Sequence, residues 1–285
     1  MEIRHRWLSF AIYAVSIGLG VLTFVYPFIL PSTVGTQSMS TAHASETPLL
    51  YVLLLTLCLG VLLFEVQGEA VKSRQVALLG VLVAINSVLR FIEIAIPGPG
   101  GFTPIFFLII LTGVVFGGRF GFLMGALTLF VSALITGGVG PWLPGQMFTA
   151  GWMGMSAALC RPLIEGLHLS GKKAEIWLLM GVGAFWGLAY GAIMNLWAWP
   201  FVAGPADQYW APGVSLQATL RRYGVYYLAT SLAWDLACSV GNVLLIGIFG
   251  APALKALRRF ERRLVFWHEV PGQTEKEREL VGGKI

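Results

Sequence analysis

The sequence predicts an all-α fold, a polytopic bundle of helices in a membrane. Of its 285 residues, 56% are hydrophobic and only 12% are charged, and the mean hydropathy is +0.76. Long apolar runs with few charges are typical of integral membrane proteins. The runs lack the alternation of apolar and polar residues that marks a transmembrane β-barrel. Helices are expected instead, because each helix satisfies its own backbone hydrogen bonds in lipid.

The apolar runs divide the chain into three parts. A helix needs roughly 20 apolar residues to cross a hydrocarbon core. The candidate spans lie at about residues 7–30, 48–66, 75–96, 102–117, 120–136, 146–161, 175–200 and 224–249. A polar linker at 67–74 separates the first two spans from the other six. The predicted parts are two N-terminal transmembrane helices within 1–67, a six-helix core at 75–255, and a basic, charged tail at 256–285.

The first span resembles a secretory signal, because Arg4 and Arg6 precede it and Ala42-His43-Ala44 is similar to a cleavage site. The apolar run is too long for a signal peptide, and the site is too distant from it. We therefore favour an uncleaved first transmembrane helix.

The core begins with features that indicate close helix packing. In the stretch 103–155, two apolar runs flank the short turn Gly117-Gly118-Arg119, and neither run has a polar face to meet water. Small residues spaced by four let helix backbones approach closely in lipid. This spacing recurs at Gly121 and Gly125, and again at Gly183, Gly187 and Gly191, so we expect packing seams there.

The basic residues predict the orientation of the chain. With these spans, 16 of the 19 lysines and arginines fall on one side of the membrane, and Arg90, Arg221 and Arg222 fall on the other. The positive-inside rule then predicts a bacterial plasma-membrane protein with both termini on the cytoplasmic side. The net charge of +5 is thus a topology signal, and no nucleic acid is expected as a partner.

Several kinds of chemistry lack support. The segment 166–173 resembles a phosphate-binding P-loop, but Lys173 stands where that motif has Ser or Thr, and no strand precedes it. The four histidines lie outside the spans, and the three cysteines lie inside them, so neither a metal site nor a disulfide framework is expected. Catalytic motifs are also missing. The expectation is a protein that is not an enzyme and has no cofactor.

Polar and aromatic side chains gather at the predicted exterior end. Arg90 and Glu93 are spaced to pair on one helix face, and Asp235 lies about halfway along the last span. Ionisable residues at membrane depth are costly and so suggest a function, although a structural ion pair or an interhelical hydrogen bond would explain them too. Six of the ten tryptophans lie at this end: Trp142, Trp152, Trp197, Trp199, Trp210 and Trp234. An aromatic belt accounts for part of this excess, and an outward-facing pocket accounts for the rest.

Residues 75–250 resemble the substrate-binding S-component of energy-coupling factor (ECF) vitamin transporters. Gly80 and Ala84 stand where that family has an AxxxA pattern, and a Pro/Gly loop at 97–101 leads into the next helix. The turn at 115–121 follows, and then comes Gly137-Gly-Val-Gly-Pro-Trp142 with Gln146. The last feature is most similar to the cobalamin-type branch.

The resemblance implies capture of a vitamin from outside and delivery through a membrane coupling subunit driven by two cytoplasmic ATPase subunits. The coupling subunit would dock on the face of Ala77, Gly80 and Ala84. The substrate would contact eight residues: Arg90, Glu93, Trp142, Gln146, Trp152, Asn195, Trp199 and Asp235. Cobalamin suits these side chains, as would a flavin, a pterin or a haem. The two N-terminal helices are extra to the family pattern.

Three other functions stay open at this point. A stand-alone secondary transporter is the main alternative, although the inverted repeat common in such proteins is not visible in the sequence. An integral membrane enzyme acting on lipids would need clustered carboxylates or a His/Ser pair at the membrane face, and a purely structural membrane subunit would need neither.

Overall fold

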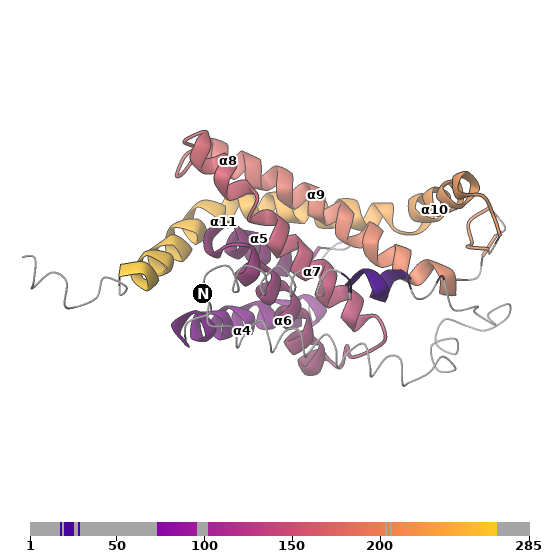
Figure 1. Ribbon diagram of the computed structural model, residues 1–285, viewed down its shortest axis with the longest axis horizontal. Helices are drawn as coiled ribbons and strands as arrows, with labels where there is room; N and C mark the ends of the chain where they lie inside the picture. Colours follow the sequence, from indigo (N-terminus) through magenta and orange to yellow (C-terminus); the bar gives the residue numbers. More distant parts are fainter. Residues whose placement is uncertain are drawn as a thin grey trace, which may run out of the picture.

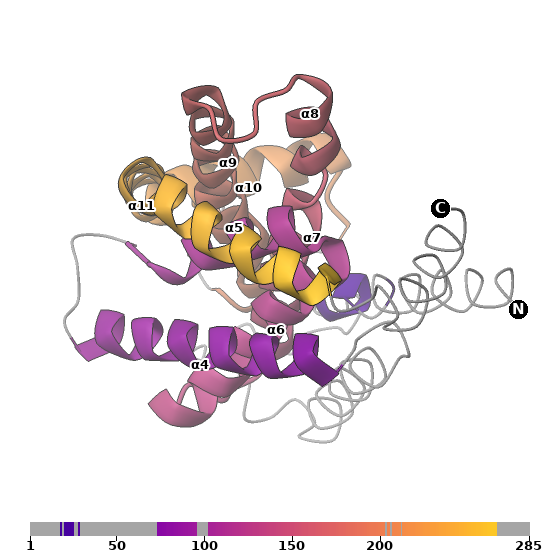
Figure 2. The ribbon, with the colours of Figure 1, turned by 90° about the vertical axis from the view of Figure 1, so that its left-hand side faces the viewer.

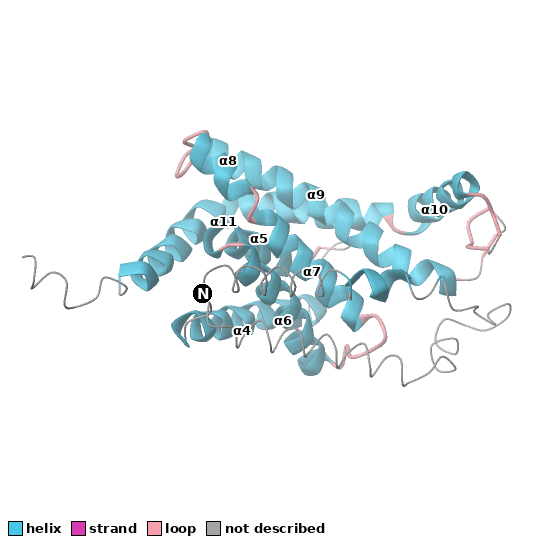
Figure 3. Cartoon of the chain, viewed as in Figure 1, coloured by secondary structure: helices cyan, strands magenta, loops and turns pink. Residues whose placement is uncertain are grey.

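The computed structural model consists of helices and short loops in the residues that it describes, which are 18, 20–25, 28, 73–95, 102–202, 204–205, 207–211 and 213–266. Its elements are α4 (Ser73–Ala95), α5 (Ile105–Phe116), α6 (Gly118–Thr136), α7 (Leu143–Ala157), α8 (Cys160–Gly166), α9 (Lys173–Ala198), the 3-10 turn η1 (Trp199–Phe201), α10 (Leu216–Thr230) and α11 (Leu232–Phe266). No strand occurs in this part of the chain (Figure 3). The predicted all-α fold is confirmed.

Four stretches among the described residues are long and apolar enough to cross a membrane. They are Arg74–Ala95, Gly118–Thr136, Lys173–Phe201 and Leu232–Arg262. Figure 1 shows the long helices α9 and α11 side by side along the length of the molecule. The chain is therefore a membrane protein with several spanning helices.

Helix α5 lies within the predicted span 102–117 but is only 12 residues long. At about 1.5 Å per residue it extends about 18 Å, which is shorter than the hydrocarbon core. It lies inside the bundle, where Ile105, Ile109 and Ile110 are fully buried (Figure 2). Its apolar sequence therefore serves protein packing more than contact with lipid.

The predicted span 224–249 differs from the structure, because the chain turns at Ser231. Helix α10 ends at Thr230, and α11 begins at Leu232 and continues for 35 residues. The Thr230 hydroxyl donates to the carbonyl of Tyr226, 2.7 Å away, and such side-chain bonds compete with helix continuation. Helix α10 also carries Arg221 and Arg222, and it lies beside the end of α9 and the start of α11 (Figure 1).

The predicted span 146–161 is also divided. Helix α7 ends at Ala157, and the short helix α8 begins at Cys160. Pro162 explains the break, since it has no N–H for the carbonyl of Ala158 and its ring crowds that position.

The seam at Gly121 and Gly125 joins α6 to α7. A Cβ at Gly121 would collide with the Gly154 carbonyl, and one at Gly125 would collide with the carbonyl of Ala150. The backbones of the two helices therefore meet directly, as the small-residue spacing predicts.

The second seam joins α9 to α11. Gly187 faces the backbone of Ser239, and Gly183 faces the side chain of Asn242. Two interhelical hydrogen bonds reinforce the contact: Ser239 Oγ donates to Ala184 O at 2.9 Å, and Asn242 Nδ2 donates to Gly183 O at 3.0 Å. The amide of Asn242 thus binds a neighbouring helix.

The N-terminal part of the chain is described only at 18, 20–25 and 28, within the predicted first span 7–30. Residues 20–25 are helical, and Phe24 is buried against the bundle. The predicted second span, 48–66, lies outside the described residues, as do Cys58 and the tail beyond 266.

Candidate functional site

Asp235 lies in the first turn of α11, and not halfway along a span as its sequence position suggests, because the last helix begins at Leu232. Its carboxylate packs over Gly191 of α9, at a place where a Cβ would collide with both carboxylate oxygens. The side chain is only 9% exposed. The first turn of a helix favours a carboxylate electrostatically.

The Asp235 carboxylate is incompletely satisfied. Its Oδ2 atom is buried without a hydrogen-bond partner among the described residues. The Tyr227 hydroxyl lies near enough to interact with the same carboxylate, and Tyr223 is within electrostatic reach. A buried acceptor with unused capacity is costly unless something binds it. This makes Asp235 suited to hold a polar group of a ligand.

A cluster of aromatic rings adjoins Asp235. Trp199 is 1% exposed, and its ring centroid lies 5.2 Å from that of Tyr223 and 6.5 Å from that of Tyr226. The indole Nε1 of Trp199 donates to Gln208 O at 2.8 Å, and the Tyr223 hydroxyl donates to Ala192 O. Helix α10 is thereby fixed against the end of α9.

Along α9, Asn195 lies between Gly191, against which Asp235 packs, and Trp199, which directly follows the helix. Gly191, Asn195 and Trp199 are spaced by four residues, so α9 presents them on one side. The Asn195 side chain is half-buried. Its amide can donate and accept hydrogen bonds.

The N-terminal segment covers part of this region. Phe24 lies 5.8 Å from the ring of Trp152, and Phe28 lies 6.3 Å from the ring of Trp199, measured between centroids. A Cβ at Gly20 would collide with the Trp152 ring. The predicted first span therefore touches two of the predicted substrate-binding tryptophans.

Trp142 and Gln146 lie where α7 begins. Trp142 is 38% exposed, and its Nε1 donates to Gly138 O at 3.2 Å. A Cβ at the neighbouring Gly145 would lie 3.6 Å from Met194 of α9, which precedes Asn195. The start of α7 is therefore close to the Asn195 end of α9.

Arg90 and Glu93 are half-buried near the end of α4 and have different neighbours from the other six residues. Glu93 accepts a hydrogen bond of 2.5 Å from the Thr103 hydroxyl. No ion pair within 4.0 Å joins Arg90 to Glu93, although their charges interact. Tyr190 of α9 lies within electrostatic reach of both. The predicted pairing is thus a longer-range attraction, and the direct partner of Glu93 is Thr103.

The predicted docking residues share an open face of α4. Ala77, Gly80 and Ala84 are all exposed, and a Cβ at Gly80 would meet no described heavy atom within 4 Å. Helix α4 lies at the edge of the bundle, where it packs against α6 and α5 (Figure 2). Its small-residue face is therefore available to another helix.

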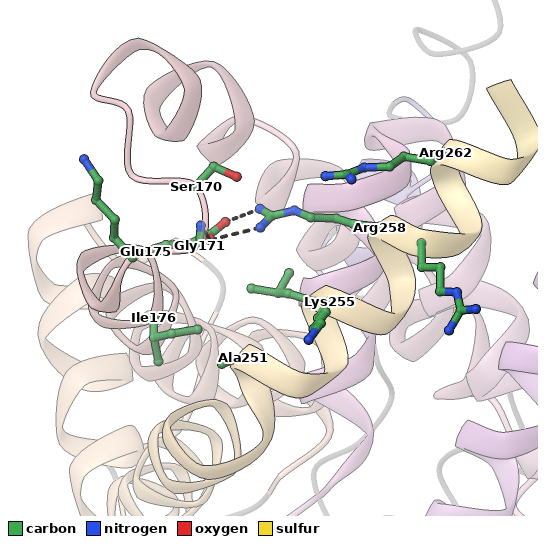
Figure 4. Close-up of a pocket in the computed structure, with 11 residues that line it drawn as sticks. Ser170, Gly171, Glu175, Ile176, Ala251, Lys255, Arg258 and Arg262 are labelled. Atoms are coloured by element: carbon green, nitrogen blue, oxygen red, sulfur yellow. Dashed lines mark hydrogen bonds and ion pairs between the residues drawn. The ribbon is translucent and has the colours of Figure 1, made fainter. Parts of the chain in front are cut away.

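A cavity that was not predicted lies at the opposite end of the bundle. It measures about 910 Å³ and is formed by the loop before α9 and by the last turns of α11 (Figure 4). The lining residues are Ser170, Gly171, Lys172, Glu175, Ile176, Ala251, Leu254, Lys255, Arg258, Arg259 and Arg262. The sequence carries a signal for this cavity in the spacing of 255, 258, 259 and 262 on one helix face, and the same residues contribute to the charge asymmetry that predicts orientation.

One buried ion pair lies in the wall of this basic cavity, and two exposed ion pairs lie beside it. Arg258 binds the carboxylate of Glu175 with two guanidinium nitrogens, and Glu175 is 1% exposed. Arg161 binds Glu165 and Glu261, at 2.9 Å each. The hydrogen bond to Glu165 raises the pKa of Arg161 above its usual value, so this guanidinium stays charged. No cluster of three metal-ligating side chains occurs among the described residues.

The chain resembles known proteins at the level of a family. A family model for the ECF transporter, substrate-specific component, matches residues 74–253. The match runs from the start of α4 into α11, and so covers nearly the whole described bundle. Searches of curated proteins and of solved structures gave no match.

Proposed function

Because the chain belongs to the family of ECF transporter substrate-specific components, we propose that it captures a vitamin or related micronutrient from outside the cell and delivers it to an ATPase-driven coupling module. The family match over 74–253 carries this proposal, since it spans the bundle that holds both the polar, aromatic end and the open face of α4. The family is a transporter component and not an enzyme family.

The proposed substrate site lies where α9 ends, α10 crosses and α11 begins. Asp235 and Asn195 would bind polar groups of the substrate, and Trp199 and Trp152 would contact its apolar surface. Trp142 and Gln146 would form the rim from α7. Sites of this kind are mostly apolar, with a few polar groups that set the orientation of the ligand.

Arg90 and Glu93 would form the far border of the site, next to Tyr190. A substrate that contacts both this border and the aromatic cluster would be large and would carry polar groups at more than one edge. A corrinoid such as cobalamin meets this requirement, and a flavin, a pterin or a haem would meet part of it.

Energy would reach the site through α4. The coupling subunit would dock on Ala77, Gly80 and Ala84, whose small side chains let a partner helix approach closely. Two cytoplasmic ATPase subunits would then drive release of the substrate inside the cell.

Uptake of a labelled vitamin by cells tests this function against a stand-alone secondary transporter. We expect uptake only when the coupling and ATPase subunits are produced with the chain, and loss of uptake when the ATPase is inactivated. Uptake that persists without these subunits and follows an ion gradient would contradict the proposal.

A further inference from the structure

The basic cavity between the loop before α9 and the end of α11 combines apolar side chains with several cations. We propose that it binds the phosphate headgroup of an anionic phospholipid from the surrounding membrane. This inference concerns the end of the bundle opposite to the substrate site and does not depend on the function proposed above.

The walls of the basic cavity change from apolar to basic along the helix axes. On α11, Ala251 and Leu254 are followed by Lys255, Arg258, Arg259 and Arg262. On the opposite wall, Ile176 lies in α9 and Lys172 lies just before it. Both walls thus offer apolar surface toward the middle of the bundle and cations toward its end, which matches an acyl chain joined to a phosphate.

The charges of the basic cavity are mostly uncompensated. Arg258 is paired with Glu175. Lys172, Lys255, Arg259 and Arg262 have no ion pair among the described residues, because the nearby Glu165 and Glu261 both bind Arg161. Arg258 and Arg262 extend from α11 toward the loop that carries Ser170 and Gly171 (Figure 4). Four such cations around one cavity attract an anion.

The depth of the basic cavity suits a lipid headgroup. A hydrocarbon core needs roughly 20 helical residues, so a span that starts at Leu232 leaves the core near Ala251. The apolar part of the cavity then lies at the edge of the core, and the cations from Lys255 onward lie at headgroup level. Basic pockets at this level are a recognised mode of binding for acidic lipids.

The loop before α9 argues against a nucleotide as the ligand. A phosphate-binding loop presents free backbone N–H groups to its ligand. Here the N–H of Gly171 donates to Glu175 Oε2 at 2.8 Å, and that of Lys172 donates to Leu169 O at 2.9 Å. The basic cavity therefore offers charged side chains at the membrane edge and not a backbone cradle.

Native mass spectrometry of the full chain in neutral detergent tests the proposal. Dioleoylphosphatidylglycerol and dioleoylphosphatidylcholine are added at equal concentration, and the lipid-bound fractions are compared. We expect preferential binding of phosphatidylglycerol. K255Q/R262Q should weaken that preference by about fivefold for each cation removed, since a cation near an anionic surface contributes about 1 kcal/mol. Arg258 is left intact, because its loss would strand the buried Glu175.

The matched control is K173Q/R221Q, which removes two exposed cations that do not line the basic cavity. It should keep the preference for phosphatidylglycerol. Equal binding of both lipids by the unmodified chain, or equal loss in the two double variants, would overturn the proposal. If K255Q/R262Q does not fold, R259Q alone provides the comparison.

A thermal unfolding series separates a lipid from a soluble anion. Phosphatidylglycerol should raise the unfolding temperature of the unmodified chain more than inorganic phosphate does at matched ionic strength. An equal rise with inorganic phosphate, without a lipid preference, would assign the basic cavity to a free anion and overturn the lipid proposal.

Discussion

Asp235 is the residue whose surroundings in the structure best support a role in substrate binding. Its carboxylate lies against Gly191, where no side chain intervenes, and Oδ2 has no hydrogen-bond partner among the described residues. Asn86 also has a buried oxygen without a hydrogen-bond partner among the described residues, but its amide donates to Ile105 O and Thr128 Oγ1 and so serves helix packing. The unused acceptor of Asp235 belongs to a carboxylate, which forms stronger hydrogen bonds than an amide oxygen, and is therefore the better candidate for contact with a substrate.

We expect Asp235→Asn to weaken affinity for the substrate by roughly 10- to 100-fold, because a hydrogen bond to a charged group contributes about 1.5–3 kcal/mol. The side chain keeps its shape, so the fold should persist. Isothermal titration with the identified substrate measures the change. Glu165→Gln, an exposed carboxylate at the other end of the bundle, is the control. Equal affinities for Asp235→Asn and the unmodified chain would remove Asp235 from the site.

Trp142 and Gln146 provide a separate test at the rim. Trp142→Ala and Gln146→Ala should each reduce affinity, by about tenfold for the tryptophan, as expected for a large aromatic contact. Trp177→Ala is the control, because it removes an indole near the start of α9, far from the rim. Trp177 is 69% exposed, and its loss should leave affinity unchanged. If the Trp142 and Trp177 variants bind equally well, the rim assignment is wrong.

At the scale of helices, the seam between α9 and α11 positions the substrate site. Gly183 and Gly187 hold α9 against α11, and Gly191 continues the same face to Asp235. The close approach thus sets where the carboxylate lies. Glycine spacing in the sequence was sufficient to predict this seam, because periodicity along one helix is a local property.

Gly187→Ala should destabilise the bundle by about 1–3 kcal/mol, since the added methyl group collides with the backbone of Ser239 and overpacks the seam. Gly181→Ala is the matched control on the same helix, because a Cβ there meets no described atom within 4 Å. Its stability should be unchanged or higher, as alanine favours a helix. Thermal unfolding in detergent compares the two, and equal losses would contradict the packing account.

Helix boundaries were less predictable than helix existence. The apolar runs of α4, α6 and α9 indicated those helices to within a few residues. The turn at Ser231 was missed, because residues 224–249 are apolar on both sides of it and contain neither proline nor an adjacent glycine at the break. Pro162 is a sequence signal that a helix ends shortly before it. The apolar run at 146–161 nevertheless predicted one continuous span up to residue 161, whereas α7 ends at Ala157.

At the scale of the whole molecule, the two ends of the bundle differ in chemistry. The end of α9 and the helix α10 lie at one end of the molecule (Figure 1), and the basic cavity lies at the other end, between the start of α9 and the end of α11. The eight predicted substrate residues could be proposed from the sequence, because aromatic and ionisable residues stand out within apolar runs. The basic cavity could not be proposed in this way, since it joins the loop at Ser170 to residues around Arg258, more than 80 positions away in the chain.

Assembly with the coupling subunit depends on the outer face of α4. Ala84→Leu should prevent co-purification of the coupling subunit, because the larger side chain blocks close approach of a partner helix. Ala174→Leu makes the same change at an exposed position of α9 and should assemble normally. Normal assembly of the Ala84→Leu chain would exclude this face as the docking surface.

Capture of a micronutrient is the central claim, and the small molecule released from gently purified protein tests it most directly. Cells are grown with a mixture of vitamins, and the released compound is identified by mass spectrometry and its absorbance spectrum. We expect one vitamin-like compound at about one molecule per chain, with a corrinoid as the first candidate. Protein that releases none after this growth, and binds none of the mixture when it is added back, would contradict the account.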